Sequence, residues 1–174
     1  FTARLRPPYY YKTGANGIWN RSPEELTALV GAMHAAGYQV ACHCNGDQAA
    51  EAFIDAVAAA QAAKPRFDHR HFIVHGQMLD EALLHRMAAR GIAYLAKGGD
   101  AEGATMFANH LYYWGDFHYS QTVGPSRSQG FSPLATAMRL GVGVSTHSDT
   151  PVSPIDPLFS AWCAANRVTS SGRI

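Results

Sequence analysis

The sequence predicts an α/β fold in which a parallel sheet is built from four strand–helix units, half of the eight units that close a (β/α)8 TIM barrel. Short apolar runs alternate with longer segments of helical periodicity, in the order α-β-α-β-α-β-α-β-α. Three of the runs end beside a histidine or an aspartate, and the carboxyl ends of strands are where a (β/α) barrel assembles a metal site. No run is followed by a glycine-rich phosphate loop, which disfavours a nucleotide-binding sheet.

The elements follow one another in a regular way along the chain. Residues 1–21 are predicted to be irregular, because prolines and glycines interrupt any period there. Ser22-Pro23-Glu24-Glu25 predicts a helix start with serine as N-cap, and Gly37 ends that helix. Asp47 is expected to cap the second helix. The remaining elements are strands over residues 38–42, 71–74, 92–95 and 142–146, and helices over 48–63, 79–90, 132–140 and 157–167.

One long segment, residues 97–131, breaks the alternation. It is rich in glycine and aromatic residues, and we interpret it as a connection between the third strand and the next helix. Connections of this length in compact domains are usually functional or disordered. Residues 109–116 within it fit a substrate-facing loop and an aromatic plug over the barrel rim equally well.

Composition excludes several classes of function. Apolar residues make up 47% of the chain and charged residues 16%, as in a globular domain with a buried core. The formal net charge is +1 and basic residues do not cluster, so nucleic acid is not an expected partner. No stretch of about 18 apolar residues exists, so no membrane partner is expected. The three cysteines lack a disulfide spacing pattern, which favours a reducing, cytoplasmic compartment.

Two histidines stand at equivalent places in successive strand–helix units. His43 comes just after the run 38–42, and His75 comes just after the run 71–74. A neutral imidazole at a strand end can bind Zn²⁺ at roughly 2.0–2.1 Å. Either histidine alone could be an ordinary hydrogen-bonded side chain, but their equivalence favours metal ligands. Cys42 and Cys44 flank His43, and alternation along a strand directs them to the opposite face, so they are not expected to be ligands.

A carboxylate follows the last strand. Asp149 can bind a metal and accept a proton, which is the general base that hydrolysis requires. Taken alone it would be an ordinary turn residue before Thr150-Pro151, but with two histidines at matching positions we favour a ligand. His147 is expected to orient Asp149 or contact substrate, with a packing role as the alternative.

Several other polar residues are not assigned chemistry. His69 and His71 precede or begin a strand and are expected to be structural or exposed. Asp116 is expected in a polar turn, and Asp156-Pro157 marks a helix start.

These residues resemble the amidohydrolase superfamily, and most closely its family 3 branch, which includes enzymes like N-substituted formamide deformylase. Four stretches carry the resemblance in the right order, over roughly residues 9–173. They are Cys42-His43-Cys44-Asn45-Gly46-Asp47, His75-Gly76-Gln77, Asn109-His110-Leu111-Tyr112-Tyr113-Trp114-Gly115-Asp116 and His147-Ser148-Asp149-Thr150-Pro151-Val152.

The resemblance implies that residues 1–174 are the C-terminal half of the barrel, strands 5 to 8 with their helices. It implies one or two Zn²⁺ ions, with His43 and His75 on one and Asp149 on the other. An activated hydroxide would attack an amide-type, non-peptide carbon–nitrogen bond, with Asp149 as base. The expected substrate is a small molecule, which we place near His110, Tyr113, Trp114 and His147. The aromatic residues of this stretch favour an apolar or aromatic acyl or amine group.

The sequence also departs from the family pattern. The histidine pair of strand 1 and the bridging lysine after strand 4 have no counterpart, and neither Lys12 nor Lys97 stands in the right context. Val74 stands where relatives usually have glutamate, and residues 97–104 look like additional sequence. Zn²⁺ suits the histidine and carboxylate ligands, and Mn²⁺, Fe²⁺ and Co²⁺ remain alternatives.

Three interpretations therefore compete. In the first, the chain is part of a metal-dependent amidohydrolase whose N-terminal half is the missing partner and lies upstream of Phe1. In the second, it is an inactive half-barrel that binds metal weakly or acts only by association, for example as a homo-oligomer through its unpaired strand edges. A deaminase or lactonase branch is a third interpretation, which the aromatic stretch disfavours.

Overall fold

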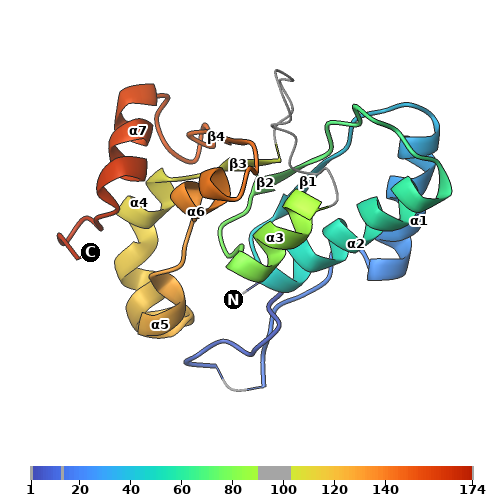
Figure 1. Cartoon of the computed structure of the whole chain (residues 1–174). Helices are drawn as coiled ribbons and strands as arrows, with labels where there is room; N and C mark the ends of the chain where they lie inside the picture. The colour runs from blue at the N-terminus through green and yellow to red at the C-terminus, as the bar shows by residue number, and fades with distance from the viewer. Residues whose placement is uncertain (1, 13, 90–102, 174) are drawn as a thin grey trace.

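A four-stranded parallel sheet forms the centre of the computed structural model, which describes residues 2–12, 14–89 and 103–173 (Figure 1). Strands that are neighbours in sequence are neighbours in the sheet, in the order β1-β2-β3-β4. This is the order in which consecutive units follow one another in a (β/α) barrel. The α/β class with a parallel sheet is therefore confirmed. The strands are β1 (Ala41–Cys44), β2 (Phe72–His75), β3 (Ala104–Met106) and β4 (Val144–Thr146).

Helices separate the strands, as the sequence predicts. Ser22 caps the first helix as expected: its side chain accepts from the Glu25 amide, and the Glu25 carboxylate accepts from the Ser22 amide. The helices between and after the strands are α1 (Pro23–Ala35), α2 (Asp47–Ala63), α3 (Glu81–Ala89), α4 (Asn109–Phe117), the π-helix η1 (His118–Thr122), α5 (Gly124–Ser128), α6 (Leu134–Arg139) and α7 (Pro157–Asn166).

The third strand differs from its predicted place. The predicted strand 92–95 lies outside the described residues, and β3 occupies the third position of the sheet instead. Residues 97–131 were interpreted as a loop connection; residues 97–102 lie outside the described residues, and the interpretation is wrong for β3 and for residues 109–122 and 124–128, which are helical. Three residues are too few to show an apolar alternation, so pairing with β2 and β4 on both sides defines this strand rather than its own sequence.

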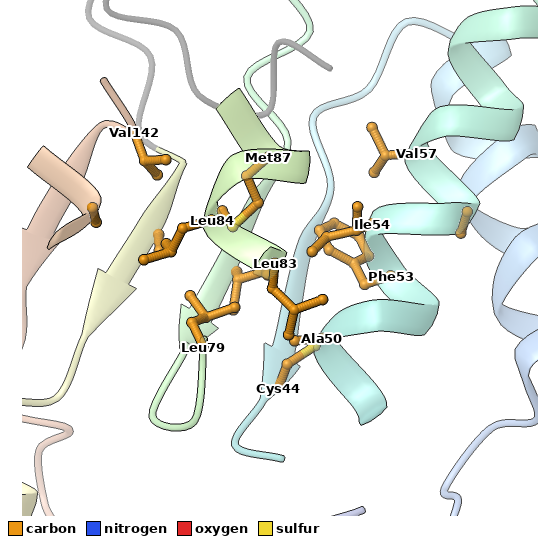
Figure 2. Packing of buried hydrophobic residues seen from close by; sticks show 14 of the residues in the cluster. Cys44, Ala50, Phe53, Ile54, Val57, Leu79, Leu83, Leu84, Met87 and Val142 are labelled. Carbon is orange, nitrogen blue, oxygen red and sulfur yellow. The ribbon is translucent and has the colours of Figure 1, made fainter. Parts of the chain in front are cut away.

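The main core lies between one face of the sheet and the helices α1, α2, α3 and α6. Side chains from α2 and α3 meet strand residues there, and Figure 2 shows Leu83 of α3 on the side of Phe53 and Ile54 of α2, whereas Leu84 points away from α2. These four side chains are almost completely buried. Because this face is filled by aliphatic packing, the other face of the sheet and its strand ends are left for polar side chains.

The N-terminal segment, residues 2–12, folds against the start of α2. A Cβ at Gly46 would lie 1.9 Å from the Arg4 carbonyl oxygen, so only glycine lets the segment pass this close. Asp47 was predicted to be the N-cap of α2, and this is wrong: Gly46 is the cap and Asp47 is the first helical residue. Its carboxylate accepts from the Arg6 backbone amide (2.9 Å) and forms an ion pair with the Arg6 guanidinium (3.2 Å). The Gly-Asp pair thus fixes the N-terminal segment.

Among the described residues, no helix combines the length and the apolar character that crossing a membrane requires. Cys42, Cys44 and Cys163 are free thiols.

Candidate metal centre

Four side chains collect at the carboxyl ends of the strands. His43 lies in β1, His75 is the last residue of β2, and His147 and Asp149 follow β4. The His147 amide donates to the Met106 carbonyl (3.2 Å), which continues the sheet to the point where the loop turns back. Parallel pairing brings these strand ends to one edge, as the sequence analysis expected.

Three of these side chains form a group with the geometry of a metal site. His75, His147 and Asp149 each offer one ligand atom, and the three atoms lie within 4.8 Å of one another. The His43 ring meets the His75 ring edge to face with centroids 4.5 Å apart, and the His147 ring lies 4.9 Å from His75. The structure thus brings His43, His75 and Asp149 to one strand edge, where His147 rather than His43 completes the three-residue group.

The backbone at two of these residues is unusual. His75 has a φ of 74° and Asp149 a φ of 56°, in the left-handed region that side chains other than glycine rarely adopt. Regular alternation would put His75 on the same face as Ile73, in the main core. The left-handed turn instead directs its ring toward His43. Strain of this kind is concentrated at functional sites, where the surrounding structure holds it in place.

The imidazoles are in the form that a metal binds. Burial, and then the neighbouring His43, lower the pKa of His75 to about 4 despite the opposing effect of Asp149. Burial also lowers the pKa of His147, again against Asp149. Both rings are therefore neutral near pH 7, with a lone pair available for coordination.

Unpartnered buried atoms show that this group fits a metal. The Nδ1 of His75 and the Nε2 of His147 are buried and have no hydrogen-bond partner in the described structure. Buried polar atoms normally have a partner, so two such nitrogens beside a carboxylate need an explanation. A cation held by histidine nitrogens and a carboxylate oxygen is the simplest one.

A cavity of about 290 Å³ opens in front of this group. Asp149 is the only acidic residue among those that line it. The lining consists of His43, Asn45, His75, Phe107, His110, Trp114, Phe117, His118, Asp149 and Val152. This mixture of apolar walls and few polar groups is typical of small-molecule sites.

A pair of histidines extends from the cavity into the protein. The Nε2 atoms of His110 and His118 lie 2.8 Å apart, and the Nδ1 of His118 lies 2.8 Å from the Thr122 hydroxyl. The π-helix η1 brings Thr122 back over the His118 ring. Because Nε2 of His110 is engaged, Nδ1 is the ring atom left for a molecule in the cavity. Burial lowers the pKa of His110 to about 3 and of His118 to about 4.

The predicted substrate residues separate into two groups. His110 and Trp114 line the cavity, with their rings 5.0 Å apart. Tyr113 does not line it: its ring contacts Tyr112, Trp114 and, on α7, Phe159. Sequence reasoning missed His118, Asn45 and Phe107. The two-turn spacing between His110 and His118 would have linked them had a helix been predicted there.

Two other predictions can be compared with the structure. Cys44 is buried in the main core, and its Sγ lies 3.6 Å from that of Cys42, so the thiols face away from the histidine group as expected.

Asp116 was placed in a polar turn, and this is wrong: it lies in α4. Its carboxylate accepts from the Thr169 and Ser171 hydroxyls and pairs with Arg173, which ties the C-terminal segment to α4.

Comparison with known proteins identifies the family of this chain. The Amidohydrolase family profile matches residues 1–173. The chain belongs to the amidohydrolase family. This confirms the resemblance drawn from the four sequence stretches.

Two curated relatives are similar to most of this chain. YtcJ of Bacillus subtilis, whose name assigns it provisionally to the amidohydrolases, is 27% identical over 97% of this chain and 29% of its own length. Protein LONG AFTER FAR-RED 3 of Arabidopsis thaliana is 28% identical over 87% of this chain and 24% of its own length. The chain therefore spans less than a third of the length of these two relatives.

Solved structures share the fold. An uncharacterized metal-dependent hydrolase from Pyrococcus furiosus matches with a TM-score of 0.75 at 21% identity, over 99% of this chain and 33% of its own. A second one, from Pyrococcus horikoshii, matches with a TM-score of 0.75 at 20% identity, over 99% and 31%. The arrangement of this amidohydrolase sheet and its helices thus recurs within longer chains.

Proposed function

We propose that this chain supplies a metal site and a substrate cavity to a metal-dependent hydrolase that cleaves amide-type, non-peptide carbon–nitrogen bonds. One observation carries the proposal: His75 and His147 each have a buried imidazole nitrogen without a partner in the described structure, and one ligand atom from each lies within 4.8 Å of an Asp149 oxygen. Membership of the amidohydrolase family and the names of the similar proteins support hydrolysis.

His75, His147 and Asp149 would hold a divalent ion, and His43, whose ring contacts that of His75, would supply a further nitrogen. Nitrogen and carboxylate donors suit Zn²⁺, and the same set accepts Mn²⁺, Fe²⁺ or Co²⁺. When bound, such an ion supplies Lewis-acid polarisation of the substrate carbonyl and activation of water.

The residues of the chain perform the remaining tasks. Asp149 accepts a proton from the attacking water, and its left-handed turn fixes the carboxylate toward the histidines. His110 offers Nδ1 to a polar atom of the substrate, with its ring position set by His118. Phe107 and Trp114 pack around His110 and exclude water from one side of the cavity.

The rest of the barrel is the expected partner. β1 and β4 each pair with only one strand among the described residues, so each offers a free edge for further strands. The alternative proposal, an inactive half-barrel that binds metal weakly or only associates, rests on the same free edges.

A metal titration tests the proposal on this chain. Calorimetric titration with Zn²⁺ should show one saturable site that His75→Ala and Asp149→Asn each weaken by about tenfold or more. His85→Ala is the matched control, because His85 is an exposed histidine on α3. Equal affinity for wild type and His75→Ala would overturn the metal assignment. With a longer chain that contains the whole barrel, faster turnover of a neutral amide than of the matching ester would support carbon–nitrogen cleavage.

A further inference from the structure

A second group of histidines lies at the opposite end of the sheet from the candidate metal centre. His34 is on α1, and His69 and His71 lie in the segment that leads into β2. All three side chains are at most 2% exposed. Imidazoles are seldom buried in such a group unless each ring nitrogen has a defined role.

Hydrogen bonds fix the tautomer of each ring. The Val40 amide donates to Nδ1 of His71 (3.0 Å), so the ring proton of neutral His71 is on Nε2. That proton points at Nδ1 of His34 (2.8 Å), and Nε2 of His34 then donates to the Lys64 carbonyl (2.7 Å). The His71 amide donates to Nδ1 of His69 (3.0 Å).

This arrangement has no place for an additional proton. A proton on Nδ1 of His71 would face the Val40 amide hydrogen, and a proton on Nδ1 of His34 would face the Nε2 hydrogen of His71. In both cases two donors would oppose each other in a buried site, and a hydrogen bond would have to break. The network is therefore complete only while His34 and His71 are neutral.

The charged groups around the histidines also disfavour protonation. The Arg66 guanidinium donates to the carbonyls of His34, Gly37 and Tyr38, directly beside the rings. The Lys64 ammonium donates to the Ala35 carbonyl at the end of α1. Among the described residues, Asp68 is the carboxylate beside His69, and Arg70 binds both of its oxygens. The cations of Lys64 and Arg66 thus lie beside the end of α1, and the Asp68 carboxylate is already paired with Arg70.

The network joins four elements. It links the end of α1 through His34, the residue before β1 through Val40, the end of α2 through Lys64 and the start of β2 through His71. The Phe72 amide also donates to the Val40 carbonyl (3.0 Å), so the same residues begin the pairing of β1 with β2.

We propose that His34 and His71 form an acid-released latch, which holds α1 and the amino end of β1 against α2 and β2 while both rings are neutral. Protonation opens the latch locally, frees the Val40 amide and loosens the β1 edge of the sheet. The latch is separate from the candidate metal centre, so it regulates the integrity of this edge independently of the proposed hydrolase function.

The pKa of His71 is shifted in the direction that the latch requires. Burial, together with the charges of His69, His34 and Arg66, lowers its pKa to about 3. An imidazole in an unfolded or opened segment has a pKa near 6.5. The closed latch is therefore fully favoured above about pH 6.5, and its advantage is lost as the pH falls from there toward 3.

Hydrogen exchange of the full chain tests the latch. The protection factors of the Val40 and His71 amides should fall by about tenfold for each pH unit below 6.5, because opening is coupled to at least one proton. The Val142 amide, which donates to the Ala137 carbonyl on the far side of the sheet, is the reference for whole-molecule unfolding, which also becomes easier in acid. Local opening predicts that the Val40 amide stays less protected than the Val142 amide at each pH, and equal protection of the two amides throughout would contradict a local latch.

A variant and a direct titration complete the test. In His71→Asn, the side-chain oxygen can replace Nδ1 as acceptor for Val40 but cannot titrate, so protection of Val40 should lose its pH dependence. The matched control His85→Asn changes an exposed histidine and should behave as wild type. In wild type, the Cε1 proton of His71 should not titrate near pH 6.5. A folded-state midpoint near 6.5 would overturn the proposal even if the variant does not fold.

Discussion

His75 turns its ring to meet His43 edge to face, although the two residues do not share a register position: His43 pairs with Val74, and His75 pairs with Cys44. A regular strand would leave the two imidazoles on opposite faces of the sheet. The φ of 74° at His75 removes this separation and places both rings at one strand edge. The candidate site thus depends on backbone conformation as much as on residue type.

This dependence can be separated from metal binding by two substitutions at His75. Both His75→Gly and His75→Ala remove the imidazole and should weaken Zn²⁺ binding equally. Glycine adopts the left-handed conformation freely, so His75→Gly should be more stable than His75→Ala by about 1 kcal/mol. Urea unfolding of the metal-free proteins measures the difference. An alanine variant at least as stable as the glycine variant would show that the backbone there is not strained.

The close approach at Gly46 gives a stability prediction. A methyl group 1.9 Å from the Arg4 carbonyl oxygen forces the N-terminal segment away from α2, so Gly46→Ala should cost about 1–3 kcal/mol. Gly31→Ala is the matched control within α1, where a Cβ would meet nothing within 4 Å, and it should stabilise the protein by about 0.5–1 kcal/mol. Thermal unfolding of both variants checks the signs, and two changes of the same sign would contradict this account.

His118 should contribute to acid sensitivity. Its pKa is lowered to about 4 by burial, whereas an unfolded histidine has a pKa near 6.5. The folded state binds fewer protons, so stability is complete above pH 6.5 and falls as the pH drops from 6.5 to 4, by up to about 3 kcal/mol. The difference between wild type and His118→Gln, measured by denaturant unfolding at pH 7 and at pH 4.5, should shrink at the lower pH. A difference that does not change with pH would mean that His118 is protonated as easily in the folded protein as in the unfolded chain.

The cysteines should not take part in metal binding. Cys42→Ser and Cys44→Ala should leave the Zn²⁺ affinity unchanged, because both thiols face the helix side of the sheet. Metal titration of each variant measures this directly. A loss of about tenfold or more in either one would make a thiolate a ligand and would revise the orientation of β1.

Structural features that follow from a local pattern in the sequence were predicted correctly. The order of elements, the capping box at Ser22 and the strand-end positions of His43, His75 and Asp149 follow from apolar patterns and helix signals that are local in sequence. The strand β3 was missed because three residues carry no period, and its partners lie on either side in space. The same limit applies to His147, whose place beside His75 depends on the left-handed turns that no side-chain pattern reveals.

The strictly sequential strand order affects how the protein assembles. Each strand pairs with the one made just before it, so most of the sheet can form from contacts of short sequence separation. The N-terminal segment is the exception, because its partners come much later in the sequence. Leu5 and Tyr9 pack against Leu111, Val123 and Phe131, and the Arg127 guanidinium donates a hydrogen bond to the Pro8 carbonyl. On a ribosome, residues 2–12 would emerge before these partners and would have to wait for them. The packing of Leu5 and Tyr9 would thus be completed only after the first three strands of the sheet have been made.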